Sequence, residues 1–200
     1  MDLENYLQNN SKTHLIFDFD NTLAQLQIDW SKWGEEIQNK LIELDPYPWK
    51  KYQDNAINLS QLQNHYIRSF GNKIKDEIIK HSIWLEINCS GGAKPNSKLI
   101  SLIPRLDKYQ KFIWTSNTRQ GVEPILENFE VKKYFEKIIT RNDVSLLKPE
   151  IEGFELIYDK KTPLKNYLFI GDSGSDKKAA KTIGIDFYKV NYFGLNLDLD

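Results

Sequence analysis

The sequence predicts an α/β fold, with a Rossmann-like parallel sheet as the core and an inserted all-α cap. Two observations carry this prediction. Short apolar runs alternate with helical patterns near the start of the chain and again after residue 90, whereas residues 24–90 show helical periodicity only. Strands that are apolar throughout suit a sheet covered on both faces, and alternation of strand and helix favours parallel strands joined by right-handed crossovers.

Five segments have the length and composition of strands. They are HLIFDFD (14–20), KFIWTSN (111–117), EKIIT (136–140), YLFIGD (167–172) and IDFYKV (185–190). The first, second and fourth are almost continuous apolar runs, which is typical of strands in the middle of a parallel sheet. The last is a candidate edge strand.

Helical patterns fill the intervals between these strands. They cover residues 96–109, 122–129, 150–159 and 175–183. Pro104 should kink or split the first helix, whereas Pro124 falls in the expected first turn of the second, where proline is tolerated. The last helix should begin with a capping serine and an acid, and it should end at Gly184.

The block at residues 24–90 interrupts this alternation and contains no convincing strand. Three segments in it place apolar residues three or four positions apart: 31–44, 59–70 and 72–87. A block of this size is too long for a loop. We therefore predict a helical cap at residues 24–90, inserted into a core formed by residues 1–23 and 91–200, with GGAKPN (91–96) as the return hinge.

The overall composition narrows the class of protein. The chain has 200 residues, 40% of them hydrophobic and 28% charged, which suits one globular domain with a modest insertion. A net charge of -1 argues against nucleic acid or an anionic membrane as partner, and a single cysteine excludes a disulfide within the chain. The polar N-terminus is unlike a signal peptide, and no run approaches the roughly 20 apolar residues of a membrane span, so we expect a soluble cytoplasmic protein.

Polar side chains gather where the predicted strands end. They are Asp18 and Asp20 after the first strand, Thr115, Ser116 and Asn117 after the second, and Asp172, Ser173 and Asp176 after the fourth. Lys148 follows the third strand and is separated from it by a loop. Ligands of open α/β sheets bind at the carboxyl ends of the strands. Clustered carboxylates repel unless a cation compensates them, and Mg²⁺ prefers oxygen ligands. These positions together predict a pocket for a metal ion and a phosphate group.

Four segments resemble the signatures of the haloacid dehalogenase superfamily, and they occur in that family's order. They are DFDNTL (18–23), FIWTS (112–116), LLKPE (146–150) and GDSGSD (171–176). The resemblance covers residues 13–190 and is closest to the phosphatase branch with a helical cap after the first signature. It implies Mg²⁺ as cofactor and a small phosphate monoester as substrate.

The resemblance also implies a role for each residue. Asp18 is similar to the nucleophile that forms an aspartyl-phosphate, and Asp20 to the general acid/base whose backbone carbonyl faces the metal. Thr22 is similar to the residue that steadies this loop. Thr115 is similar to the hydroxyl that binds phosphate, with Ser116 as a close rival and Asn117 beside them. Lys148 is similar to the lysine that orients the nucleophile and the phosphate.

The fourth signature supplies the remaining roles. Asp172 is similar to the metal ligand that joins Asp18 and Asp20, and Asp176 to the acid that holds either a metal-bound water or Lys148. Ser173 lies between them and is expected to support the same turn. The helical insertion resembles the cap that such enzymes close over the substrate.

Three functions remain open at this point. A phosphatase is favoured over a dehalogenase because Asp20 supplies an acid that breaking a carbon–halogen bond does not need. A phosphomutase similar to β-phosphoglucomutase would share every core residue, since the cap decides which acceptor receives the phosphoryl group. A non-catalytic binding protein of the same fold would be expected to have lost a signature, and none is lost. The substrate and the oligomeric state are not predicted.

Overall fold

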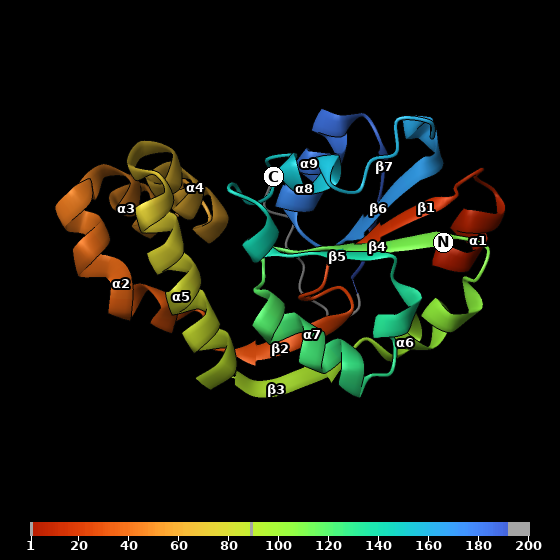
Figure 1. The fold of residues 1–200 in the computed structure, drawn as a ribbon, viewed down its shortest axis with the longest axis horizontal. Coiled ribbons are helices and arrows are strands. Elements are labelled where there is room, and N and C mark those ends of the chain that lie inside the picture. Colours follow the sequence, from red (N-terminus) through yellow and green to blue (C-terminus); the bar gives the residue numbers. More distant parts are fainter. Residues whose placement is uncertain (1, 89, 192–200) are drawn as a thin grey trace.

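The computed structural model describes residues 2–88 and 90–191, which form an α/β core with a helical lobe beside it (Figure 1). The central sheet has five strands in the order β5-β4-β1-β6-β7, and every neighbouring pair is parallel. Their bounds are β1 His14–Phe17, β4 Gln110–Trp114, β5 Lys137–Ile139, β6 Tyr167–Gly171 and β7 Asp186–Lys189. This arrangement confirms the predicted α/β class and parallel sheet.

The register of the central strands brings their carboxyl ends to one edge of the sheet. Phe17 of β1 pairs with Ile113 of β4 on one side and with Ile170 of β6 on the other. All four residues of β1 and all five of β6 are buried, as expected of strands covered on both faces. The segments that follow β1, β4 and β6 therefore begin side by side.

Helices cover both faces of the sheet (Figure 1). One apolar cluster joins the sheet to α1 (Leu3–Gln8), α6 (Ser97–Leu102) and α7 (Arg119–Asn128), and a second joins it to α8 (Glu152–Glu155) and α9 (Gly174–Ile183). Short 3₁₀ turns complete the connections at Ile103–Arg105, Lys132–Tyr134, Arg141–Asp143 and Leu164–Asn166. The described residues thus form the layered structure expected of a Rossmann-like core.

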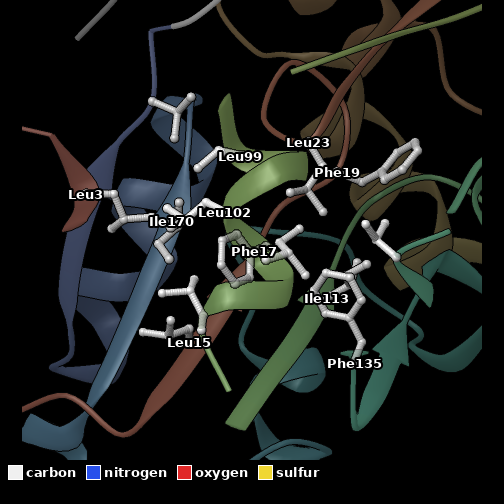
Figure 2. Packing of buried hydrophobic residues seen from close by; sticks show 14 of the residues in the cluster. Leu3, Leu15, Phe17, Phe19, Leu23, Leu99, Leu102, Ile113, Phe135 and Ile170 are labelled. Carbon is white, nitrogen blue, oxygen red and sulfur yellow. The ribbon is translucent and has the colours of Figure 1, made fainter. Parts of the chain in front are cut away.

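Figure 2 shows the first of these clusters, in which Phe17 and Ile113 from the sheet meet Leu99 and Leu102 from α6. Phe17 is completely buried, and so is Phe19, which lies between Asp18 and Asp20. Burying a phenylalanine side chain contributes roughly 1.5–3 kcal/mol. The apolar side chain of Phe19 therefore anchors the loop that carries the acids.

Two helix starts differ from the prediction because side-chain caps begin the helices earlier. α7 begins at Arg119 rather than at residue 122, since the Thr118 hydroxyl accepts a hydrogen bond from the Gly121 N–H at 3.2 Å. The expectation that Pro124 lies in the first turn is thus wrong, and it lies inside the helix. α9 is capped by Ser173 and not by Ser175, and it ends at Gly184 as predicted, with φ +83°.

Two of the other predicted core helices are shortened. The first is split as its proline predicts, since α6 stops at Leu102 and a 3₁₀ turn containing Pro104 follows. The helix expected over residues 150–159 is reduced to the four residues of α8. The first segment keeps its apolar residues in a core cluster, and the second keeps Phe154 and Ile157 in the other, so this packing is retained where regular helix is not.

The helical lobe consists of α2 (Ser31–Leu44), α3 (Pro46–Gln53), α4 (Leu59–Phe70) and α5 (Asn72–Asn88). It has an apolar cluster of its own, in which Trp33, Leu62, Tyr66 and Ile78 are almost completely buried. Within the described part of the chain, every helix is too short or too polar to cross a bilayer. Cys89 lies outside the described residues.

A two-stranded antiparallel ribbon joins the lobe to the core, and it corrects the prediction that residues 24–90 contain no strand (Figure 1). β2 (Ala24–Ile28) pairs with β3 (Ser90–Pro95), so GGAKPN belongs mainly to a strand and is not a simple hinge. β3 is rich in glycine, and β2 alternates small, polar and apolar residues over only five positions. Neither has strong strand propensity alone, and the pairing itself stabilises both.

Candidate active site

A tight turn after β1 positions Asp18 and Asp20. The Asp18 N–H continues the sheet by donating to the Ile170 carbonyl at 2.9 Å. The chain then turns back, and the Phe19 carbonyl accepts three backbone N–H bonds from residues 22–24 at 2.9–3.2 Å. Asn21 adopts the left-handed conformation that this turn requires, with φ +57°. The turn leaves Asp18 at the end of the strand and Asp20 on the loop beyond it.

Lys148 lies between two of the acids. Its Nζ is 2.7 Å from Asp18 Oδ1 and 2.6 Å from Asp176 Oδ1, and it donates to the Trp114 carbonyl at 3.1 Å. The lysine is only 3% exposed. Burial disfavours its charge, but the two carboxylates outweigh this effect and raise the pKa of Lys148. Its charged form is therefore favoured where it lies, between two buried carboxyl groups.

Three carboxylates gather around this lysine. Asp18, Asp172 and Asp176 each have an oxygen within 4.8 Å of the other two. Burial and the neighbouring Asp176 raise the pKa of Asp18, and the same two causes raise the pKa of Asp172 to about 7. One ammonium faces three acids, so the fully ionised cluster carries an excess of two negative charges. A divalent cation would neutralise this excess, and an all-oxygen donor set is the kind that Mg²⁺ prefers.

The turn after β6 holds two of these acids in place. Asp172 Oδ1 accepts a hydrogen bond from the Thr22 hydroxyl at 3.1 Å, which links the first signature to the fourth. Ser173 caps α9, and its hydroxyl donates to Asp176 Oδ2 at 2.7 Å. A Cβ at Gly171 would lie 2.6 Å from Asp176 Oδ2. The glycine thus leaves the space in which Asp176 reaches Lys148.

The Asp20 side chain is held apart from this group of three. Its Oδ1 accepts backbone N–H bonds from Leu26 at 2.8 Å and from Asn21 at 3.1 Å. Burial raises the pKa of Asp20 to about 6, although these two bonds act in the opposite direction. A carboxyl group with such a pKa exchanges its proton close to neutral pH, which suits a general acid/base. The backbone carbonyl of Asp20 is expected to be a metal ligand, and this stays a prediction.

The loop after β4 carries the predicted phosphate-binding residues. Thr115 is 2% exposed, and its hydroxyl donates to Asn117 Oδ1 at 2.8 Å while accepting from the Asn117 N–H at 3.2 Å. Ser116 is half-buried, and its carbonyl accepts from Arg141 Nε at 2.9 Å. Since β4 is the parallel neighbour of β1, this loop begins beside Asp18. Both hydroxyls stay candidates for binding phosphate.

The structure adds buried residues that the sequence pattern did not indicate. Glu86, near the end of α5, accepts from the Thr118 N–H at 2.9 Å and from the Thr118 hydroxyl at 2.5 Å. Arg141 donates to Gln63 of α4 as well as to Ser116, and burial lowers its pKa to about 10. These contacts join the helical lobe to the loop after β4. Nothing in their local sequence indicates such a role, since their partners lie 25 or more residues away.

The fold and the site together define a Rossmann-like α/β protein with a cluster of acids at the carboxyl edge of its parallel sheet. Comparison with known protein families identifies the family to which the chain belongs. The family model for haloacid dehalogenase-like hydrolases matches residues 15–190, and the chain belongs to this family.

Individual relatives agree with this assignment. Phosphoglycolate phosphatase from Salmonella paratyphi A is 37% identical over 80 residues, a segment that covers 39% of this chain and only 31% of that enzyme. A haloacid dehalogenase-like hydrolase from Bacteroides fragilis has a similar structure, with a TM-score of 0.58, 23% identity, and coverage of 90% of this chain and 88% of the other. A HAD family enzyme from Bacteroides thetaiotaomicron, solved with magnesium and inorganic phosphate, has a TM-score of 0.53 and 19% identity, with coverage of 91% and 96%. At these identities the solved structures show a shared fold.

Proposed function

We propose that this hydrolase is a Mg²⁺-dependent phosphatase that cleaves a small phosphate monoester through an aspartyl-phosphate on Asp18. The observation that carries the proposal is the cluster in which Lys148 contacts Asp18 and Asp176 while Asp172 lies within 4.8 Å of both acids. A nucleophilic carboxylate, a fixed cation and additional metal-ligating oxygens are the groups that phosphoryl transfer to an aspartate needs.

The carboxylates of Asp18 and Asp172 would hold the metal ion, with the Asp20 carbonyl as the third expected protein ligand. When bound, Mg²⁺ supplies positive charge that offsets the charge of a phosphoryl group during its transfer. The fit rests on the donor set, because three clustered acids with one lysine leave negative charge that a divalent ion would balance. The neighbour solved with magnesium and inorganic phosphate supports the same interpretation.

The protein's own residues account for both halves of the reaction. An Asp18 carboxylate oxygen forms a bond to phosphorus while the bond from phosphorus to the ester oxygen breaks, and its electron pair leaves with that oxygen. Protonated Asp20 donates its proton to the departing oxygen. In the second half, ionised Asp20 takes a proton from water as the water oxygen bonds to phosphorus and the bond between phosphorus and Asp18 breaks. Phosphate leaves, and both side chains return to their starting states.

The remaining residues hold the phosphoryl group and the nucleophile. Lys148 would contact phosphoryl oxygens as well as Asp18, and the hydroxyl of Thr115 or Ser116 would bind a further oxygen. The helical lobe would act as a cap and select the ester. Similarity to phosphoglycolate phosphatase over part of the chain makes phosphoglycolate a first compound to test, together with sugar phosphates and nucleoside monophosphates.

The proposal is tested by measuring phosphate release from a broad panel of metabolite esters with Mg²⁺ present. The wild-type protein should hydrolyse at least one ester, and Asp18→Asn should reduce its turnover to background because the amide is not a nucleophile. Asp54→Asn, at an exposed position of the lobe, is the matched control and should keep full activity. Release of phosphate by the Asp18→Asn variant at the wild-type rate would contradict the covalent mechanism. A product whose phosphate has moved within the molecule would instead identify a mutase.

A further inference from the structure

The loop that carries Lys148 is held by a residue of the helical lobe. Asn64, in the middle of α4, is 2% exposed, and its side-chain amide makes two hydrogen bonds to the residue immediately before the lysine. Its Nδ2 donates to the Leu147 carbonyl at 2.8 Å, and its Oδ1 accepts from the Leu147 N–H at 2.8 Å. One side chain therefore binds both polar groups of a single residue, 83 positions along the chain.

This loop has little regular structure of its own. Lys148 lies in a turn between the 3₁₀ turn at Arg141–Asp143 and α8, outside any helix or strand. The Leu147 carbonyl accepts one other backbone bond, from the Glu150 N–H at 3.1 Å. A lysine on such a loop needs support from elsewhere to stay within 2.7 Å of two acids.

The two leucines that precede Lys148 pack against different parts of the molecule. Leu147 belongs to the core cluster that joins the sheet to α8 and α9, whereas Leu146 packs against the apolar cluster of the helical lobe. The loop thus lies between the core and α4, and Asn64 makes its polar contact at that boundary. A buried N–H that loses its partner is costly, so the contact is strongly favoured once α4 is in place.

We propose that Asn64 is a positioning residue that holds Lys148 between Asp18 and Asp176, so that docking of α4 completes the ion-pair geometry of the site. The proposal rests on the phosphatase function proposed above, and it adds to it a part for the lobe beyond covering the substrate. Asn64 acts through the Leu147 backbone and does not touch the reacting groups. If Asn64 is removed, the lysine should shift away from the position that supports the nucleophile.

The kinetic test compares Asn64→Ala with Arg68→Gln, using p-nitrophenyl phosphate with saturating Mg²⁺. Arg68 is the matched control because it also joins α4 to the core, through an exposed ion pair with Glu150, without holding Leu147. Misplacement of a catalytic group by about 1 Å costs on the order of 100-fold. We expect Asn64→Ala to lower kcat by about 10- to 100-fold with a smaller change in KM, and Arg68→Gln to stay within about twofold of wild type because exposed ion pairs contribute little.

A second readout needs no turnover. Hydrogen exchange of the Leu147 amide should be slow in the wild-type protein and in Arg68→Gln, and at least about tenfold faster in Asn64→Ala, because its acceptor is gone. The side-chain NMR signal of Lys148 should change in the same variant. If the wild-type protein released no phosphate from any ester, the proposed function would fail, while the exchange and NMR measurements would still decide the positioning claim.

Three results would overturn the proposal: unchanged Leu147 exchange in Asn64→Ala, unchanged kcat in that variant, or an equal loss of kcat in Arg68→Gln, which would indicate general loosening of the lobe. If Asn64→Ala does not fold, Asn64→Asp replaces it. A neutral aspartic acid reproduces the donor and the acceptor of the amide, so its kcat relative to wild type should rise as the pH is lowered. A constant ratio would contradict the two-point contact.

Discussion

The acid cluster predicts an unusual dependence of stability on pH in the metal-free protein. The pKa of Asp172 is raised from 3.8 to about 7 by burial and by Asp176. A raised pKa means that the folded state binds the proton more tightly than the unfolded chain does. The stability linked to Asp172 is therefore present at low pH and is lost as the pH rises from about 4 through about 7.

The size of this effect follows from the shift. Each tenfold change in an acid constant is worth about 1.4 kcal/mol, so Asp172 corresponds to a loss on the order of 4 kcal/mol across this range. For a chain of 200 residues, 1 kcal/mol moves Tm by about 2–4 °C. The variant Asp172→Asn has a neutral side chain at this position, so it has no buried charge and no repulsion from Asp176. In excess chelator at about pH 8 we therefore expect it to be more stable than the wild-type protein, by roughly 8–16 °C in Tm.

The assay is thermal unfolding of both proteins at about pH 5 and pH 8, first with chelator and then with Mg²⁺. At the lower pH the two proteins should differ less than half as much in Tm, because folded wild-type Asp172 is then neutral and only part of the range between the two pKa values has been crossed. Mg²⁺ should stabilise the wild-type protein at the higher pH and have a much smaller effect on Asp172→Asn. Equal pH dependence of the two proteins without metal, or equal stabilisation of both by Mg²⁺, would refute the reasoning about the cluster.

Two further substitutions test individual parts of the site. Asp20→Asn should lower turnover of an alkyl phosphate by about 10²–10⁴, the usual size of acid–base catalysis. It should lower turnover of p-nitrophenyl phosphate much less, because that leaving group needs no proton. Steady-state rates with both esters check this, and equal losses would argue against Asp20 as the acid. Gly171→Ala should destabilise the fold by about 1–3 kcal/mol, because its Cβ would lie 2.6 Å from Asp176 Oδ2 and the carboxylate would have to leave Lys148. Urea unfolding measures this loss, and wild-type stability with unchanged activity would show that Asp176 has room to move.

The parts of the fold that could be predicted from the sequence are those set by local pattern. The apolar runs of β1, β4 and β6 are unambiguous because both faces of each strand are buried. The bounds of α2 and α4 match the predicted segments, since amphipathic periodicity defines a surface helix well.

Other features depend on contacts between distant segments. The ribbon of β2 and β3 was missed because each strand is short and gains its hydrogen bonds only from the other. α3 was missed because PYPWKKYQ begins with a proline-rich turn, although proline is well tolerated at the first helical position. Local propensity carries little information about either element.

The same distinction applies to the site. The acids and Lys148 could be located because they follow strands whose carboxyl ends must meet at one edge. Asn64 and Glu86 lie on helices of the lobe, and their partners, Leu147 and Thr118, are 83 and 32 positions away. No spacing rule connects such pairs, so only the packed structure shows that side chains of the lobe bind the loops after β4 and before Lys148.

The most direct test of the central claim is detection of the phosphorylated intermediate. The protein would be mixed with a hydrolysed ester and Mg²⁺, quenched in acid within milliseconds, digested and analysed by mass spectrometry. We predict a phosphoryl group on the peptide that contains HLIFDFDNTL, located at Asp18 and absent from Asp18→Asn. Turnover with no phosphorylated peptide, or with the group on Asp20 or Asp172, would contradict the account.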